Sequence, residues 1–222
     1  AGRAVGHGGA VALAWIGHSV RALETMRQPL EDRHITISRA HGTVTYPADI
    51  CLVAAMNPCP CGNFGTEQHC TCSDGAVYRY QRRISGPVLD RIDLFVDVPR
   101  VEVHKLMESS NGATPPSAES SSNVRQRVVS ARRVQQERFG ECGPNANASL
   151  SAREVNRYCY DRLDDRARTL IQEAVDRLSL SARGFHRVLK VARTISDLAK
   201  SDVITAQHVA EAVQYRRRSK LA

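Results

Sequence analysis

The pattern of hydrophobic positions differs between the two halves of the 222-residue chain. In the first half, short β-branched and apolar runs lie between turn-forming residues, whereas in the second half apolar residues recur at helical spacing. Between them, residues 109–123 are rich in Ser, Asn and Pro and have almost no side chains able to join a core. The pattern predicts an α/β part at residues 19–108, a linker at 109–123 and an all-α domain at 124–222.

One helix and four strands are predicted in the α/β part, at residues 19–28, 34–39, 43–46, 50–56 and 94–98. Pro29 is expected to end or kink the helix. The first two strands flank His41-Gly42 and therefore predict a hairpin. The third run is continuously apolar, which is typical of a parallel strand buried on both faces. The last run alternates apolar and polar residues and stops at Pro99.

Five helices are predicted after the linker. Their apolar stripes start at Val124, after Ser151, near Leu170, at Phe185 and after Thr205. Ser151 with Glu154 three residues later is the pattern of a capping box, and Thr205 can cap the last helix. Helices of this number and spacing predict a compact bundle.

Charge and cysteine content suggest a polyanionic partner and a reducing compartment. Residues 1–123 hold 11 Lys and Arg against 12 Asp and Glu, while residues 124–222 hold 20 against 11. A basic half commonly meets DNA because neutralised phosphates release counterions, although a solvated helical surface explains the charge equally well. No run of 18 apolar residues and no credible signal peptide is present, so no membrane association and a cytoplasmic location are expected.

Four cysteines form two close pairs with the spacing C-x-C-x8-C-x-C: Cys59, Cys61, Cys70 and Cys72. Four thiolates in this arrangement can surround a Zn²⁺ ion tetrahedrally, so we expect a structural zinc site. The pairs are tighter than the usual C-x2-C knuckle, so four reduced cysteines in an exposed insert remain an alternative, and His69 could replace one ligand. The other three cysteines have no partner pattern and are assigned to ordinary core or surface positions: Cys51, Cys142 and Cys159.

Several blocks of residues resemble the ComM/YifB family of magnesium-chelatase-like proteins. They are residues 21–32, the Leu52–Gly62 block with Cys70-Thr-Cys72, residues 83–94 and residues 180–198. The resemblance implies a AAA+ fold, in which a parallel sheet with a β-hairpin and cysteine insert precedes an all-α helical lid. It also implies ATP and Mg²⁺ between the subunits of a hexameric ring, and an intact protein that acts as a DNA helicase in branch migration during natural transformation.

The same resemblance assigns roles to three residues near a nucleotide. Asn57 is similar to sensor 1, which orients the attacking water. Arg91 is similar to the arginine finger that one subunit offers to its neighbour's ATP, and Arg183 is similar to sensor 2 of the lid. Without the family pattern, Asn57 would be assigned to an Asn-Pro turn and Arg183 to surface charge.

The predicted hairpin corresponds by resemblance to the pre-sensor 1 hairpin, which projects toward the pore of the ring. Arg33, His34 and Arg39 would place positive charge where a single- or double-stranded DNA backbone could pass without its sequence being read. A plain solvent-exposed hairpin explains these residues nearly as well.

The chain departs from the family pattern near its start. Family members carry a Walker A loop, G-x-x-x-x-G-K-[ST], and a Walker B strand ending in acidic residues, and neither is found. Residues 12–19 stand where the Walker B strand is expected, and residues 1–18 show no resemblance. We therefore expect a truncated or frameshifted product, or a gene-model error, that does not hydrolyse ATP alone.

Two other functions stay open. The first is a non-catalytic zinc-bearing module that binds DNA or a protein partner. The second, magnesium insertion into a porphyrin, rests on the superfamily name alone, and the cysteine insert favours the ComM/YifB branch instead.

Overall fold

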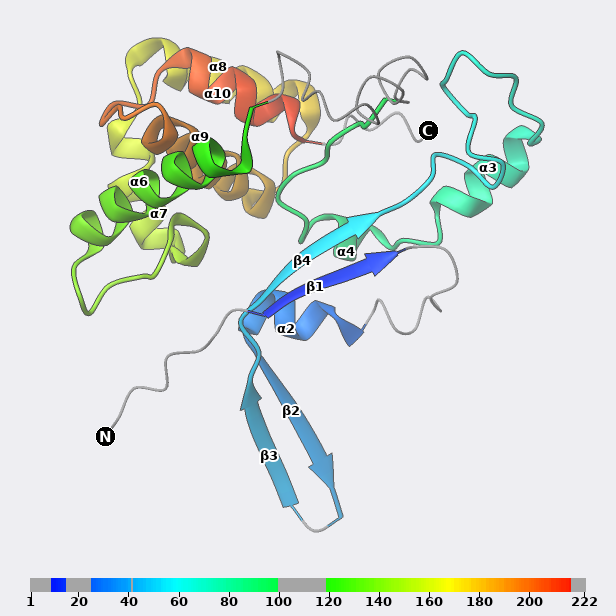
Figure 1. Cartoon of the computed structure of the whole chain (residues 1–222), viewed down its shortest axis with the longest axis horizontal. Coiled ribbons are helices and arrows are strands. Elements are labelled where there is room, and N and C mark those ends of the chain that lie inside the picture. The colour runs from blue at the N-terminus through cyan, green and yellow to red at the C-terminus, as the bar shows by residue number, and fades with distance from the viewer. Residues whose placement is uncertain (1–8, 15–24, 41, 100–118, 217–222) are drawn as a thin grey trace. The chain divides into compact units, whose positions relative to one another are not determined.

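A computed structural model describes residues 9–14, 25–40, 42–99 and 119–216. The chain forms two compact units that divide between Ile92 and Asp93. The first unit mixes strands and short helices, and the second is helical (Figure 1). In the part of the chain that is described, no helix has the length and apolar character needed to cross a membrane.

The first unit contains two small two-stranded sheets. Its elements are β1 (Gly9–Ala14), α2 (Arg27–Asp32), β2 (His34–Arg39), β3 (Gly42–Pro47), β4 (Ile50–Ala55), α3 (Asp74–Gln81) and α4 (Gly86–Leu89). β1 and β4 are parallel, with Gly9 opposite Ile50 and Ala14 opposite Ala55. β2 and β3 form the antiparallel hairpin that the sequence predicted, and it extends away from α2 (Figure 1).

Two predictions for the first unit have a different outcome in detail. Pro29 lies buried in the first turn of α2, where a missing backbone N–H costs no hydrogen bond, and a turn at Met26 separates this helix from the helical residue Thr25. Residues 19–24 of the expected helix lie outside the described residues. β4 forms as predicted but is not buried on both faces: Val53 is 60% exposed. β4 has β1 as its single strand partner within the described ranges, so no second neighbour covers it.

The strand expected at residues 94–98 is absent from this described segment. The Phe95 backbone N–H donates to the Tyr215 carbonyl at 2.8 Å instead of joining a ladder. Val96 and Val98 are 66% and 84% exposed, so the apolar side chains that suggested an inward face do not reach a core. Alternation alone was therefore an insufficient signal for a strand here.

The helical unit confirms the predicted five-helix bundle within residues 119–216. Its helices are α6 (Ser121–Phe139), α7 (Ala152–Tyr158), α8 (Asp165–Leu178), α9 (Ala182–Leu198) and α10 (Ala206–Gln214), with 3-10 turns η1 (Asn147–Ser149) and η2 (Tyr160–Arg162). α6 begins at Ser121, so residues 121–123 belong to a helix and not to the linker. Ser120 caps α6, accepting from the Asn123 backbone N–H at 3.2 Å.

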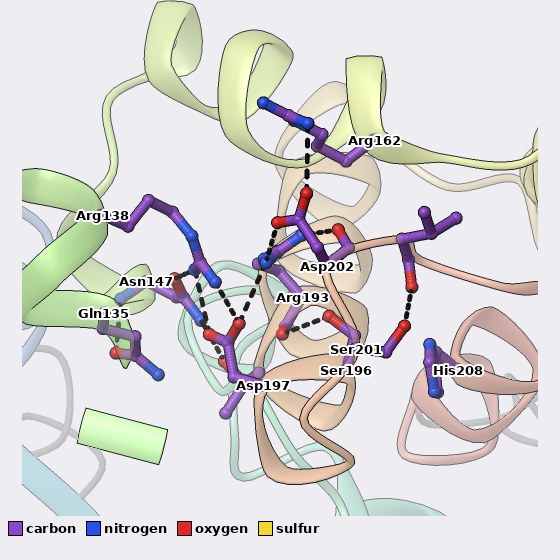
Figure 2. A network of polar contacts seen from close by, with 12 residues as sticks. Gln135, Arg138, Asn147, Arg162, Arg193, Ser196, Asp197, Ser201, Asp202 and His208 are labelled. Carbon is purple, nitrogen blue, oxygen red and sulfur yellow. Dashed lines mark hydrogen bonds and ion pairs between the residues drawn. The ribbon is translucent and has the colours of Figure 1, made fainter. Parts of the chain in front are cut away.

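Apolar side chains from four of these helices fill the core of the unit. Val155 of α7, Ile171 of α8, Leu189 of α9 and Val209 of α10 are all fully buried within it. The Ser151–Glu154 capping box is present as predicted, and Thr205 is the N-cap residue of α10. A network of polar side chains also crosses the unit between α6, η1 and α9 (Figure 2).

Candidate functional site

The four predicted cysteines converge in the loop between β4 and α3. Cys59 Sγ lies 3.3 Å from Cys61 Sγ and 3.7 Å from Cys70 Sγ, and Cys61 and Cys70 are 3.6 Å apart. With Cys72, the four sulfurs lie within 4.8 Å of one another. This donor set fits a tetrahedral zinc ion, and it consists of cysteines alone, so the alternative ligand His69 is not needed.

Backbone N–H groups surround two of the sulfurs and favour their thiolate forms. Burial raises the pKa of Cys59, and the Cys61 side chain raises it further, yet N–H groups of Phe64 and Gly62 help bring its net pKa below the ordinary value. The Phe64 N–H lies 3.3 Å from Cys59 Sγ. The N–H of Asn63, then the Cys59 side chain, lower the pKa of Cys61 to about 5. Such donors stabilise the anionic sulfur that a metal requires.

The second pair of cysteines holds its protons more tightly than the first pair. The Cys72 backbone N–H lowers the pKa of Cys70, but burial and the sulfurs of Cys61 and Cys59 outweigh it and raise the pKa to about 12. The pKa of Cys72 is also raised, because burial and the same two sulfurs outweigh the Cys61 backbone N–H. Four thiolates therefore need a cation between them to coexist at neutral pH.

The other cysteines lie where the sequence assigned them. Cys159 is fully buried in the helical core, and burial raises the pKa of its thiol to about 12. Cys51 and Cys142 are exposed free thiols. None of the three belongs to the cysteine cluster.

Asn57 follows β4 by two residues and lies against the cysteine loop. Its exposed side chain approaches Gly62, where a Cβ atom would stand 3.8 Å from Asn57 Nδ2. Gly62 has φ +86, a conformation that glycine adopts without strain, and its N–H donates to the Cys59 carbonyl at 3.1 Å. The turn that brings the first two cysteines together therefore lies next to Asn57.

β1 ends beside the strand that leads to Asn57. Ala14, its last residue, pairs with Ala55 of β4. Parallel neighbours bring their carboxyl ends to the same sheet edge, which is where ligands bind in sheets of this kind. The six residues of β1 read Gly-Ala-Val-Ala-Leu-Ala and include no carboxylate.

Arg91 is held inside the first unit by its own chain. Its Nη2 pairs with Glu31 of α2, and its Nη1 donates to the Pro87 carbonyl at 2.6 Å. The side chain is 10% exposed, and its buried Nε has no hydrogen-bond acceptor among the described residues. No sequence pattern indicated the Glu31 contact, because the two residues are 60 positions apart.

Arg183 lies in the second unit, in the first turn of α9. Ser181 caps this helix and accepts from the Gly184 N–H at 3.1 Å. Arg183 is exposed, and Arg187, one turn later, pairs with Asp93. Asn57 and Arg91 thus belong to one compact unit and Arg183 to the other.

The three predicted DNA-contacting residues spread along the hairpin and do not form one cluster. Arg33 lies at its base, where Nε is 3.8 Å from Asp49 Oδ1. His34 Nδ1 lies 2.9 Å from the Asp32 carbonyl. Arg39 is exposed at the tip, opposite Gly42.

Comparison with known families accounts for most of the chain. Residues 7–106 match the family described as magnesium chelatase, subunit ChlI, and residues 118–216 match its C-terminal family, magnesium chelatase, subunit ChlI C-terminal. The first match includes part of residues 1–18, the segment in which the sequence alone offered no resemblance.

Individual relatives give the same result. The chain is 41% identical to competence protein ComM of Haemophilus influenzae over 196 residues, which cover 88% of this chain and 36% of that protein. It is 40% identical to the uncharacterized protein YifB of Escherichia coli over the same shares. The chain therefore spans little more than a third of the length of these relatives.

Proposed function

The chain belongs to the magnesium chelatase ChlI family, in the branch of ComM and YifB, and from this membership we propose that it is part of an ATP-driven DNA motor. The motor would be a hexameric AAA+ ring in the cytoplasm that acts as a helicase in branch migration. The observation that carries the proposal is the order of the two family matches together with Asn57 at the carboxyl end of β4, beside β1.

Three side chains would act on a nucleotide held between subunits. When bound, ATP with Mg²⁺ supplies the phosphoryl group and neutralises charge on its oxygens. Asn57, exposed after β4, would orient the attacking water. Arg91 would serve a neighbour's nucleotide, using N–H groups not engaged by Glu31 and Pro87 or exchanging those partners. Arg183 would approach the phosphates of its own subunit.

The cysteine cluster would hold one structural Zn²⁺ in this proposal. The four sulfurs have the spacing and the N–H donors that a closed site of four cysteines needs, and the loop carries Gly62 against Asn57. Zinc would thus fix the turn that lies next to Asn57. A closed site of four thiolates leaves no position for a substrate, so its role is structural.

A second candidate function is a non-catalytic module that carries zinc and binds DNA or a protein. It is favoured by one observation, the cluster of four cysteines, which can hold a metal ion without a nucleotide.

ATP hydrolysis by the purified chain tests whether one copy holds a complete site, since the motor fragment and the module both expect no turnover from it alone. We expect no DNA-stimulated turnover from this chain alone, and salt-dependent DNA binding. Turnover that survives purification and disappears in Arg91→Ala would show a complete site and exclude the module. Because Arg91 also pairs with Glu31, Arg82→Ala is the matched control: Arg82 is exposed and its Nη1 contacts the Tyr78 hydroxyl at 2.6 Å.

A further inference from the structure

The hairpin of β2 and β3 has two chemically different faces. On one face, hydroxyl side chains pair across the strands: Thr36 Oγ1 lies 3.2 Å from Thr45 Oγ1, and Ser38 Oγ lies 3.1 Å from Thr43 Oγ1. These hydroxyl groups hydrogen-bond to one another, so they need no ligand to satisfy them. The opposite face is apolar and is made by the intervening residues of each strand.

Four large side chains form this apolar face, and about half of each is exposed. Ile35 pairs with Tyr46 and Ile37 pairs with Val44, in neighbouring rungs of the hairpin. They are 40%, 52%, 43% and 51% exposed, in that order. Cross-strand pairs of aromatic and β-branched residues stabilise a hairpin, but here they leave an apolar surface open to water.

The charged residues of the hairpin indicate which kind of partner would bind this apolar face. Arg39 lies at the tip on the apolar side, because it follows Ile35 and Ile37 at two-residue spacing, and it has no ion-pair partner within the described ranges. Residues 33–47 include two arginines and two histidines but no Asp or Glu. A polyanion is therefore attracted along the hairpin, whereas an acid-free basic surface repels a second copy of itself.

An aromatic ring beside aliphatic side chains and an arginine is suited to a single nucleic-acid strand. Base faces are apolar and stack on aromatic rings, and phosphates accept from arginine. In a duplex the base faces are covered by neighbouring bases, so only phosphates and groove edges would meet the hairpin. A single strand therefore buries the apolar face when it binds, whereas a duplex leaves that face exposed.

We propose that the apolar face of the hairpin, with Tyr46 as its aromatic ring, binds the bases of single-stranded DNA while Arg39 contacts the phosphates. This rests on the proposed DNA-binding function and deepens it, because it selects the substrate: single strands are held by base contacts and duplexes by charge alone. Sequence preference is not expected, since every base has a stacking face.

Three labelled probes of equal length test the proposal by fluorescence anisotropy with the full chain: oligothymidylate, an abasic strand with the same phosphates, and a duplex. We expect oligothymidylate to bind more tightly than the abasic strand. Tyr46→Ala should weaken oligothymidylate binding roughly tenfold, the loss typical of one stacked base. It should leave the abasic strand and the duplex unchanged.

Two control variants show whether weaker binding comes from loss of the Tyr46 ring or from loss of the hairpin structure. Tyr46→Phe keeps the ring and should retain binding. Thr45→Ala changes the neighbouring residue on the hydroxyl face and should bind all probes as the parent does. A Tyr46→Trp variant in a Trp15→Phe background should be quenched by oligothymidylate but not by the abasic strand, which reports contact with bases directly.

The outcomes separate this inference from the function on which it rests. Equal affinity for oligothymidylate and the abasic strand, or equal weakening of all probes by Tyr46→Ala, overturns base contact and leaves DNA binding intact. Self-association that Tyr46→Ala abolishes without affecting any probe would make the face a protein interface and also overturns it. If no probe binds at low salt, the proposed DNA binding fails as well.

Discussion

Arg138 of α6 and Asp197 of α9 form a two-pronged ion pair inside the helical unit. Arg138 Nη1 lies 3.0 Å from Asp197 Oδ2, and Nη2 contacts Oδ1 (Figure 2). The Asp197 side chain is fully buried and also accepts from Asn147 Nδ2 at 2.8 Å, and Arg193 Nη2 lies 3.2 Å from it. One carboxylate thus connects α6, η1 and α9.

Asp197→Ala is expected to destabilise the helical unit by about 3–5 kcal/mol, because it removes the carboxylate that pairs with Arg138 and one of the two carboxylates beside the buried Arg193. Arg193 is 1% exposed and Arg138 is 13% exposed, so neither can regain full hydration. Urea unfolding followed by far-ultraviolet circular dichroism measures the loss.

Glu173→Ala is the matched control, because it also removes a carboxylate that pairs with an arginine. Its partner Arg177 is 79% exposed, so the change should cost at most about 0.5 kcal/mol. Equal losses for Asp197→Ala and Glu173→Ala would contradict a special role for the buried network.

The capping box of α7 predicts a defined pH dependence. The Ser151 hydroxyl and then its backbone N–H donate to Glu154, at 2.6 and 2.7 Å, and lower the pKa of that carboxyl. A lowered folded-state pKa means that the stabilisation is present above the unfolded value, about 4.3, and is lost as pH falls through the folded value.

Glu154→Gln should therefore destabilise the chain at pH 7 and have a smaller effect in strong acid. Solvent screening of this partly exposed group keeps the difference below about 1 kcal/mol. Unfolding free energies of both proteins across the acid range test this, with Glu173→Gln as a surface control. A difference in unfolding free energy between the two proteins that grows toward low pH would contradict this prediction.

The sequence predicted the helical unit better than the first unit, for a physical reason. Helical stripes, Ser151 and Thr205 are local signals, and each marks a helix that the structure contains. The strand expected at 94–98 and the burial of β4 depended on which neighbours would cover them, and a sequence pattern does not identify those neighbours. The Arg193–Asp197 pair looks like an ordinary surface pair at four-residue spacing, although it is buried.

In the candidate site, too, local patterns were predictable from the sequence and contacts between distant residues were not. Cysteine spacing predicted the cluster because two short pairs on one loop have few ways to lie apart. Glu31 and Arg91 meet across 60 positions, which no local pattern could indicate. The two faces of the hairpin were present in the alternation of residues 34–39, but its exposed apolar side became evident only from the structure, in which no described helix or strand covers it.

About one equivalent of tightly bound zinc is expected in the chain when it is purified without chelators. Replacing Cys59 and Cys70 together with Ser should abolish it, whereas the same change at the exposed Cys51 and Cys142 should not. Because the pKa of Cys70 is raised to about 12 without metal, binding releases protons and the apparent affinity should rise with pH. Native mass spectrometry that finds metal-free protein with no chelator used would contradict the site.

The last prediction concerns which part of the chain carries the positive charge that is proposed to contact DNA. Residues 124–222 carry an excess of nine positive charges, and α6 exposes Arg125, Arg132 and Arg133. We expect weak binding to duplex DNA that falls with salt, because each neutralised phosphate adds about 0.9 to the log-log slope. Changing these three arginines to Ser should lower the slope by up to about 2.7 if each contacts one phosphate.

The comparison set on the hairpin is Arg33, His34 and Arg39, also changed to Ser, which removes two formal positive charges at pH 7 against three in the α6 set. If the slope falls with the hairpin set but not with the α6 set, the hairpin matters more than net charge. Anisotropy titrations at several salt concentrations measure both slopes, and binding indifferent to salt would contradict an electrostatic mode. Weak binding by one chain is compatible with the proposed hexameric ring, because six subunits around one DNA would raise the effective concentration of each contact.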